Sequence, residues 1–235
     1  MLYPLFSFVA VFIFAMIHLF SAKVQQLSFI SHGRFLSAGG GVAIAYVFID
    51  LLSKLSESDV IVTQALSGVF PYFERHVYIM ALLGFLLFFA VDRTQKTASN
   101  NHAFWLSLLS YSLFNFLIGY AVADKDNPEV KPLFLFTLAI ALHYFTNDYS
   151  LSEVHGEQYR QYKWILILSL FLGWFAGLWI ILVPTAVALI SAFIGGGVIM
   201  NVTRHELPQD NPNSMEAFLS AAGIYTCILL AIGER

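Results

Sequence analysis

The chain has few charged residues and almost no cysteine. Lys, Arg, Asp and Glu make up 11% of its 235 residues, whereas 58% are hydrophobic and the mean hydropathy is +0.72. So few charges cannot coat a soluble globule of 26.3 kDa, and lipid is therefore the expected solvent for most of the chain. The net charge of -3 argues against nucleic acid as a partner. The single cysteine, Cys227, excludes an intrachain disulfide and a cysteine-based metal site.

Signatures of two large hydrolase classes are also missing. The chain contains neither H-E-x-x-H, which places two zinc ligands on one helix face, nor the G-x-S-x-G turn that exposes a nucleophilic serine. No pair of apolar runs offers a clear nucleophile with its base. These absences predict that the protein is not an enzyme.

Eight apolar runs are each close to the ~20 residues that a helix needs to cross the hydrocarbon of a bilayer. They cover residues 2–22, 35–53, 76–91, 103–123, 133–149, 164–183, 185–203 and 215–232. The predicted fold class is an all-α integral membrane protein with eight transmembrane helices in a single domain over residues 1–235. No Lys or Arg precedes the first apolar run, which predicts a retained helix rather than a cleaved signal peptide.

Two details of this layout are less regular. The apolar segment 60–73 is short and contains Gly68 and Pro71, so an interfacial or re-entrant piece is expected rather than a ninth span. The connection between the sixth and seventh spans, at Val183 and Pro184, is very short, and it predicts that these two spans form an antiparallel hairpin. Eight spans put both termini on the same side of the membrane. The distribution of Lys and Arg predicts that this is the outer side of the cell's plasma or inner membrane.

A repeated pattern links the second and seventh spans. Residues 39–42 read GGGV and are followed by Asp50, and residues 195–198 read GGGV and are followed by Glu206 at the same spacing. Matched helices that cross in opposite directions predict an inverted-topology repeat, the plan of many secondary transporters. The alternative is that triple glycine recurs by chance as a packing face. The repeat divides the chain into a first repeat (1–95), a central helix pair (103–163) and a second repeat (164–235).

The stretch Lys131–Trp164 carries most of the polar residues that interrupt an apolar run. At about 100° per residue, His143 and Asn147 lie on one stripe of a helix, and Asp148 and His155 lie on the adjoining stripe. Imidazole and carboxylate donors bind zinc, iron or manganese, and histidine can also pass a proton near neutral pH. A hydrogen-bonded packing role is the alternative for His143, and a solvated helix end is the alternative for His155. His18, alone in the first span, is expected to be structural.

Two of these spans resemble the ZIP (Zrt/Irt-like) family of metal transporters. Residues 114–119, FNFLIG, are similar to the family's H-N-x-x-[DE]-G, and residues 139–148, AIALHYFTND, are similar to its A-x-A-L-H-[EN]-x-P-[HE]-[EG]. The glycine-rich spans also resemble the family's second and seventh. The resemblance implies eight spans with outward termini, an inverted repeat of spans 1–3 and 6–8, and a metal path between spans four and five.

The sequence departs from the family pattern at several ligand positions. Phe114 and Ile118 stand where the family has His and an acid, Thr146 replaces a proline, and the sixth span has no acid. The metal site is therefore degenerate. The remaining candidate ligands are His143, Asn147, Asp148 and Asn115, with Asp50, Glu206 and His155 as secondary candidates.

Three functions fit these residues. The first is ZIP-like transport of a divalent metal cation, with zinc preferred over iron or manganese and with transport that is retained, altered or lost. The second is a membrane-embedded metal-dependent enzyme using His143, Asp148 and His155. The third is a transport-inactive binding or regulatory relative. The expected partners are the metal ion as substrate and the lipid bilayer, and a homodimer is compatible with the sequence.

Overall fold

The computed structural model describes residues 3–24, 32–66, 75–95, 100–123, 130–207 and 212–233. Within these ranges the chain is helical and contains no strand. The α-helices are α1 (Tyr3–Val24), α2 (His32–Ala45), α3 (Leu52–Leu66), α4 (His76–Gln95), α5 (Asn100–Ala123), α6 (Val130–Trp179), α7 (Pro184–Asn201) and α8 (Pro212–Gly233). Two π-helical turns, η1 (Tyr46–Leu51) and η2 (Val202–Glu206), follow α2 and α7 without a break.

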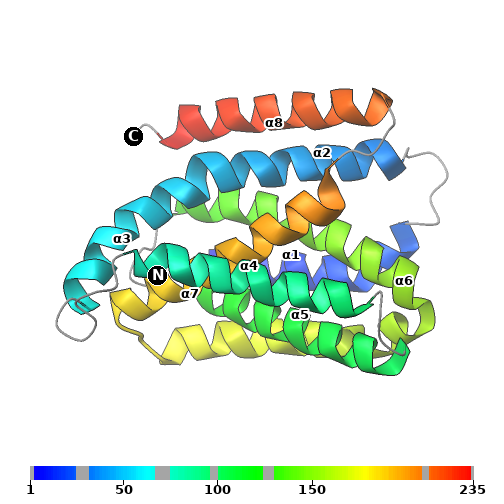
Figure 1. The fold of residues 1–235 in the computed structure, drawn as a ribbon, viewed down its shortest axis with the longest axis horizontal. Helices are drawn as coiled ribbons and strands as arrows, with labels where there is room; N and C mark the ends of the chain where they lie inside the picture. Colours follow the sequence, from blue (N-terminus) through cyan, green and yellow to red (C-terminus); the bar gives the residue numbers. More distant parts are fainter. Residues whose placement is uncertain are drawn as a thin grey trace.

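The long helices run back and forth along one direction (Figure 1). Gly156 reverses the chain inside α6 with φ 38° and ψ -99°, a conformation that favours glycine because it has no Cβ. We call residues 130–155 the first arm of α6 and residues 157–179 the second arm. With this reversal, the described residues make eight passes, and α1 begins at the end of the molecule where α8 ends (Figure 1).

Seven helical segments are long and apolar enough to cross a membrane. They are Tyr3–Ser21, Gly33–Leu66, His76–Thr94, His102–Ala123, His155–Trp179, Pro184–Arg204 and Met215–Ile232. The first arm of α6, which contains the predicted span 133–149, is helical but does not reach the same hydropathy, because its polar residues fall inside the arm. The chain is therefore an all-helical protein with the long apolar helices of a membrane protein.

The segment predicted as an interfacial or re-entrant piece begins as a helix extension. Residues 60–66 belong to α3, which continues α2 through η1, and residues 67–73 lie outside the described ranges. The helix runs to Leu66 because no Gly or Pro stands between Leu52 and Leu66 to stop it, so residues 60–66 are not a span of their own, and their interfacial or re-entrant placement stays a prediction.

The turn at Pro184 is as tight as predicted, but the two helices do not pack as a hairpin. Val183 is extended (φ -65°, ψ 148°) and Pro184 opens α7, where a missing N–H costs nothing. Beyond the turn the helices diverge: α6 packs on α5, and α7 packs on α4. A short loop therefore does not make these neighbours in sequence neighbours in space.

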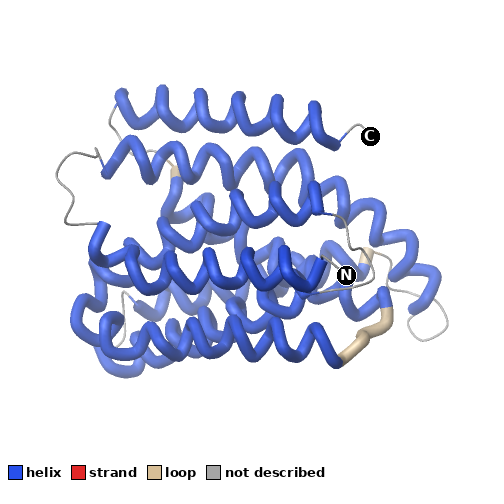
Figure 2. The backbone as a smooth tube through the Cα atoms, turned by 180° about the vertical axis from the view of Figure 1, so that it is seen from behind, coloured by secondary structure: helices blue, strands red, loops and turns tan. Residues whose placement is uncertain are grey.

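The helices form two groups. The first bundle contains α1, α5 and α6, and the second bundle contains α2, α3, α4, α7 and α8, with α8 lying along α2 at one side of the molecule (Figures 1 and 2). Glycines bring backbones together inside each bundle. A methyl group on Gly173 would clash with the Phe116 carbonyl oxygen of α5, and one on Gly196 would clash with the Ala81 carbonyl oxygen of α4. Between the bundles, α2 packs on α6, where Gly39 faces the Thr146 side chain, and α4 packs on α5.

The two π-helical turns occupy matching positions. η1 begins five residues after Gly41, and η2 begins five residues after Gly197. π-helical turns are rare and often occur at functional sites, so two of them at one offset are not expected from packing alone. The helices that carry them also make matching contacts, because α2 packs on α8 and α7 packs on α4.

Replacing Gly173 by Ala tests the close approach inside the first bundle. The added methyl group meets backbone, which cannot rotate away, so α5 and the second arm of α6 must separate. We expect a loss of about 1–3 kcal/mol in the free energy of unfolding, measured in detergent micelles. Gly223→Ala is the matched control, because a methyl group there has no neighbour within 4 Å. Equal stability of the two variants would contradict this packing.

Candidate functional site

A buried cluster of polar side chains ties the three helices of the first bundle together. His18 of α1 lies between Asp148 on the first arm of α6 and Asn115 of α5. Its Nδ1 is 2.7 Å from Asp148 Oδ2, and its Nε2 is 2.8 Å from Asn115 Oδ1. His18 and Asp148 are fully buried and Asn115 is 1% exposed. We call these three residues the buried triad.

The hydrogen bonds indicate that His18 is an imidazolium ion. Asn115 donates through Nδ2 to the Tyr111 carbonyl oxygen at 2.8 Å, so its Oδ1 faces His18 as an acceptor. An ionised Asp148 accepts at the other ring nitrogen, Nδ1, and the ring then carries hydrogen on both nitrogens. With hydrogen on both nitrogens, the charged ring faces the Asp148 carboxylate at salt-bridge distance. The triad is therefore a buried ion pair with one neutral amide.

Further hydroxyl groups surround the triad. Ser21 of α1 donates to Asp148 Oδ2 at 3.5 Å and lies 3.4 Å from the hydroxyl of Tyr159, which donates to the His18 carbonyl oxygen. The ring of Tyr144 is 4.8 Å from the His18 ring. Asp148 Oδ1 and the Tyr144 hydroxyl have no hydrogen-bond partner among the residues that the structure describes. One carboxylate oxygen at the triad is thus available to a further donor or a cation.

His143 and Asn147 occupy a different face of α6. They are 3% and 4% exposed, and together with Phe136 they fall on one stripe of the first arm, because they are separated by seven and four residues. At Phe136 this stripe meets the second bundle. The Phe136 ring contacts Tyr46 of η1 at 6.0 Å, and the His143 ring lies 6.0 Å from Phe114. Phe114 in turn packs on the second bundle at α4.

The predicted ligands are therefore divided between two faces of α6. Asp148 and Asn115 meet through His18 inside the first bundle, whereas His143 and Asn147 lie on the stripe that begins at Phe136, and the His143 ring lies near Phe114 of α5. Within the described ranges, no three side chains of His, Cys, Asp or Glu are grouped so that they could hold a metal ion. The family-like ligand set is not assembled in this arrangement, since an imidazolium ion already occupies an oxygen of Asp148 and the oxygen of Asn115.

The secondary candidates lie apart from the triad. Asp50 of η1 forms an ion pair with Lys54 at 2.8 Å, one helical turn away. The His155 ring packs against Phe104 at 5.2 Å, and its Nε2 has no hydrogen-bond partner in the described part of the chain. Glu206 belongs to η2, and its side chain is outside the described part. The three residues named for an enzyme, His143, Asp148 and His155, are not brought together as a metal site.

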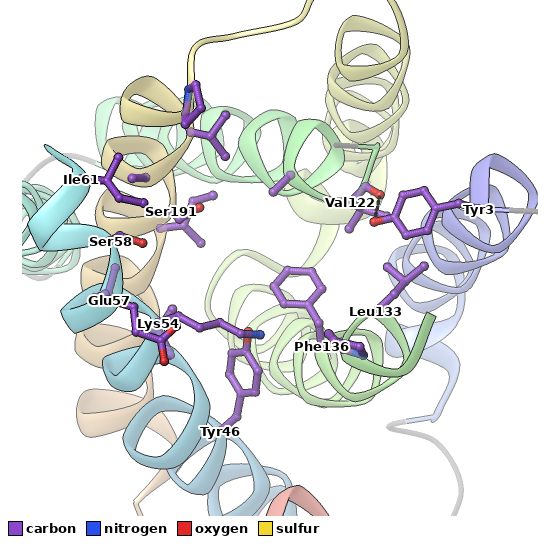
Figure 3. Close-up of a pocket in the computed structure, with 18 residues that line it drawn as sticks. Tyr3, Tyr46, Lys54, Glu57, Ser58, Ile61, Val122, Leu133, Phe136 and Ser191 are labelled. Atoms are coloured by element: carbon purple, nitrogen blue, oxygen red, sulfur yellow. Dashed lines mark hydrogen bonds between the residues drawn. The ribbon is translucent and has the colours of Figure 1, made fainter. Parts of the chain in front are cut away.

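A cavity of about 460 Å³ opens between the two bundles at the end where α1 begins. Figure 3 shows Lys54, Glu57 and Ser58 of α3 on one wall, Tyr3 on the opposite wall and the Phe136 ring between them. Mixed polar and apolar walls of this kind admit water. The cavity therefore gives water a route toward the junction of the bundles.

Sequence reasoning missed the role of His18, which lies 130 residues from its carboxylate partner. A signal was present. An ionisable residue inside an apolar span is costly unless it has a partner, and the span carries Ser21 one turn further along the same face. The sequence does not show that α1 packs against α6, and only that contact identifies Asp148 as the partner of His18.

Removing one member of the ion pair should destabilise the fold strongly. His18→Ala leaves the Asp148 carboxylate buried without its counter-charge, and we expect a loss of about 3–5 kcal/mol in the free energy of unfolding. In a double-mutant cycle with Asp148→Ala, the double variant should lose clearly less than the sum of the single losses. His102→Ala removes an exposed histidine of α5 and is the control. Additive losses at His18 and Asp148 would contradict the pairing.

Searches with protein-family models, against curated proteins and against solved structures gave no match to this chain. The resemblance to ZIP transporters accordingly depends on the motifs of residues 114–119 and 139–148 and on the two glycine-rich helices. The geometry of the two bundles and of the buried triad is the basis for the function proposed below.

Proposed function

We propose that the protein is a ZIP-like membrane transport protein whose substrate is a divalent metal cation of the zinc, iron or manganese class. The observation that carries this proposal is a buried carboxylate, Asp148, which is paired with His18 inside one bundle and lies one residue from Asn147 on the stripe that meets the other bundle. Buried ionisable groups inside apolar spans are expensive, and they mark ion pathways more often than packing positions.

Matching features of the two glycine-rich helices support an inverted repeat. η1 and η2 each begin five residues after the last glycine of the preceding helix. In addition, α2 packs on α8 and α7 packs on α4. We assign residues 1–95 and 164–235 to the two repeats and residues 103–163 to the central pair. In repeats of this kind, substrates bind near the middle of the bilayer between the halves, beside interrupted helices.

The packing also supports a sliding exchange of access. Backbone-to-backbone contacts through glycine lie inside each bundle, whereas the junction is made largely of side chains, such as Phe136 on Tyr46. Side chains can exchange partners more readily than interlocked backbones, so the junction is the natural plane of movement. Movement of the first bundle would carry the triad and the His143 stripe together. The proposal also places both termini on the outer side of the plasma or inner membrane.

His18 has a defined task in this scheme. Its imidazolium ion neutralises Asp148 when no metal is present, which lowers the cost of holding a carboxylate in an apolar bundle. A divalent cation that binds Asp148 can use the unpartnered Oδ1 first, and it competes with His18 for Oδ2. On α6, Asn147 is the preceding residue and His143 lies five residues, about 1.4 turns, before Asp148, and both occupy the adjoining face of the helix.

A second candidate function is a transport-inactive relative. It is favoured by one observation: His18 fills the position between Asp148 and Asn115, and the described residues include no group of three metal-ligating side chains. In that case the ion pair would be a permanent replacement for the metal. The two candidates share a fold and differ in whether a cation moves.

Metal flux separates the two candidates. Protein reconstituted in liposomes that contain a zinc-sensitive dye should take up zinc, and His143→Ala should lower the initial rate at least about tenfold, as expected when a metal-ligating or ligand-orienting group is lost. His102→Ala, at an exposed site, should leave the rate unchanged. Correctly folded wild-type protein that gives no flux with zinc, iron or manganese would contradict transport and favour the inactive relative.

A further inference from the structure

The floor of the cavity is an aromatic contact between the two bundles. Tyr46 of η1 and Phe136 of the first arm of α6 both line the cavity, and their rings meet edge to face with centroids 6.0 Å apart. In Figure 3 the Phe136 ring lies between the α3 wall and the wall formed by Tyr3 and Val122. Among the α6 residues that line the cavity, Phe136 is the nearest in sequence to His143, so cavity water reaches the His143 stripe at this ring.

Phe136 and His143 share one stripe of α6. Seven residues correspond to two turns, so His143 lies about 10 Å further along the helix on the same face as Phe136. His143 is 3% exposed, and it is not among the residues that line the cavity. The aromatic pair is thus placed between the water of the cavity and the His143 imidazole.

Each ring of the pair belongs to a different bundle, and this determines how the contact can open. Tyr46 is the first residue of a π-helical turn, a local irregularity that re-aims side chains within a helix. Phe136 stands on a regular helix of the first bundle. Displacement of one bundle along the other separates the rings without breaking a backbone hydrogen bond.

From this geometry we infer that Tyr46 and Phe136 form the gate between the cavity, which is the entry vestibule, and the His143 stripe. The inference deepens the proposed function and rests on its assignment of the junction as the pathway. Water and a hydrated cation fill the vestibule while the rings are in contact, and they reach His143 only when the rings part. The gate itself concerns access of water, so it can be tested with no metal present.

Thiol accessibility tests the gate. In a Cys227→Ser background, Ser191→Cys places a thiol on the cavity wall and His143→Cys places one behind the aromatic pair. The protein in lipid nanodiscs is treated with a positively charged, water-soluble methanethiosulfonate, and the modification rate is followed by mass spectrometry. Cys at 191 should react rapidly, and Cys at 143 should react at least about tenfold more slowly because it reacts only after local opening.

The decisive comparison uses Phe136→Ala and its matched control. Phe136→Ala should raise the rate at position 143 by at least about tenfold, since the opening step no longer limits it. Phe134→Ala removes a ring that is 64% exposed on the outside of the same helix and should leave the rate unchanged. If Phe136→Ala lowers the yield of monodisperse protein, Tyr46→Ala tests the same contact from the other bundle.

Two results would overturn the gate. One is a thiol at 143 that already reacts as fast as the thiol at 191; the other is a rate at 143 that does not change when the pair is removed. Neither result depends on zinc uptake. If the modification rate at position 143 changes as expected but the protein shows no metal flux, the vestibule and the aromatic gate are supported and the proposed metal substrate is excluded.

Discussion

An ion pair enclosed in an apolar bundle is the interaction on which the rest of this structure depends. A carboxylate without water is tolerable only if a counter-charge and hydrogen bonds replace the solvent, and His18 supplies the charge to Asp148 from α1, 130 residues away in sequence. Asn115 then fixes the other side of the ring, so that three helices must meet at one point. The first bundle is organised around this requirement, and its packing follows from it.

The second constraint is the way in which backbones approach one another. Glycines let α5 meet the second arm of α6 and let α7 meet α4 at distances that no side chain would permit. Both contacts are inside a bundle, whereas aromatic rings fill the junction between bundles. Each bundle is therefore held together by close backbone contacts, whereas side chains make the boundary between the bundles. The cavity and the stripe that contains Phe136 and His143 lie at this boundary. A transport protein needs such a boundary, because access to a site changes only when two parts can move past each other.

Much of the fold could be predicted from the sequence, because apolar length and polar interruptions report directly on helices in lipid. The hairpin predicted at Pro184 shows the limit of this reasoning: the turn is tight, yet the helix before it packs on α5 and the helix after it packs on α4. The candidate site was less accessible. The polar residues of α6 were recognisable, but which face each one occupies, and that His18 would fill the place beside Asp148, depends on helix neighbours that no local pattern encodes.

The protonation state of His18 tests the central claim most directly. Protein labelled with ¹⁵N-histidine can be measured by nuclear magnetic resonance in nanodiscs at neutral pH, with His18→Gln used to assign the signal. The account predicts that both ring nitrogens of His18 carry hydrogen, as the two acceptors Asp148 and Asn115 require. A non-protonated Nδ1, which denotes a neutral imidazole beside a protonated Asp148, would contradict the buried ion pair.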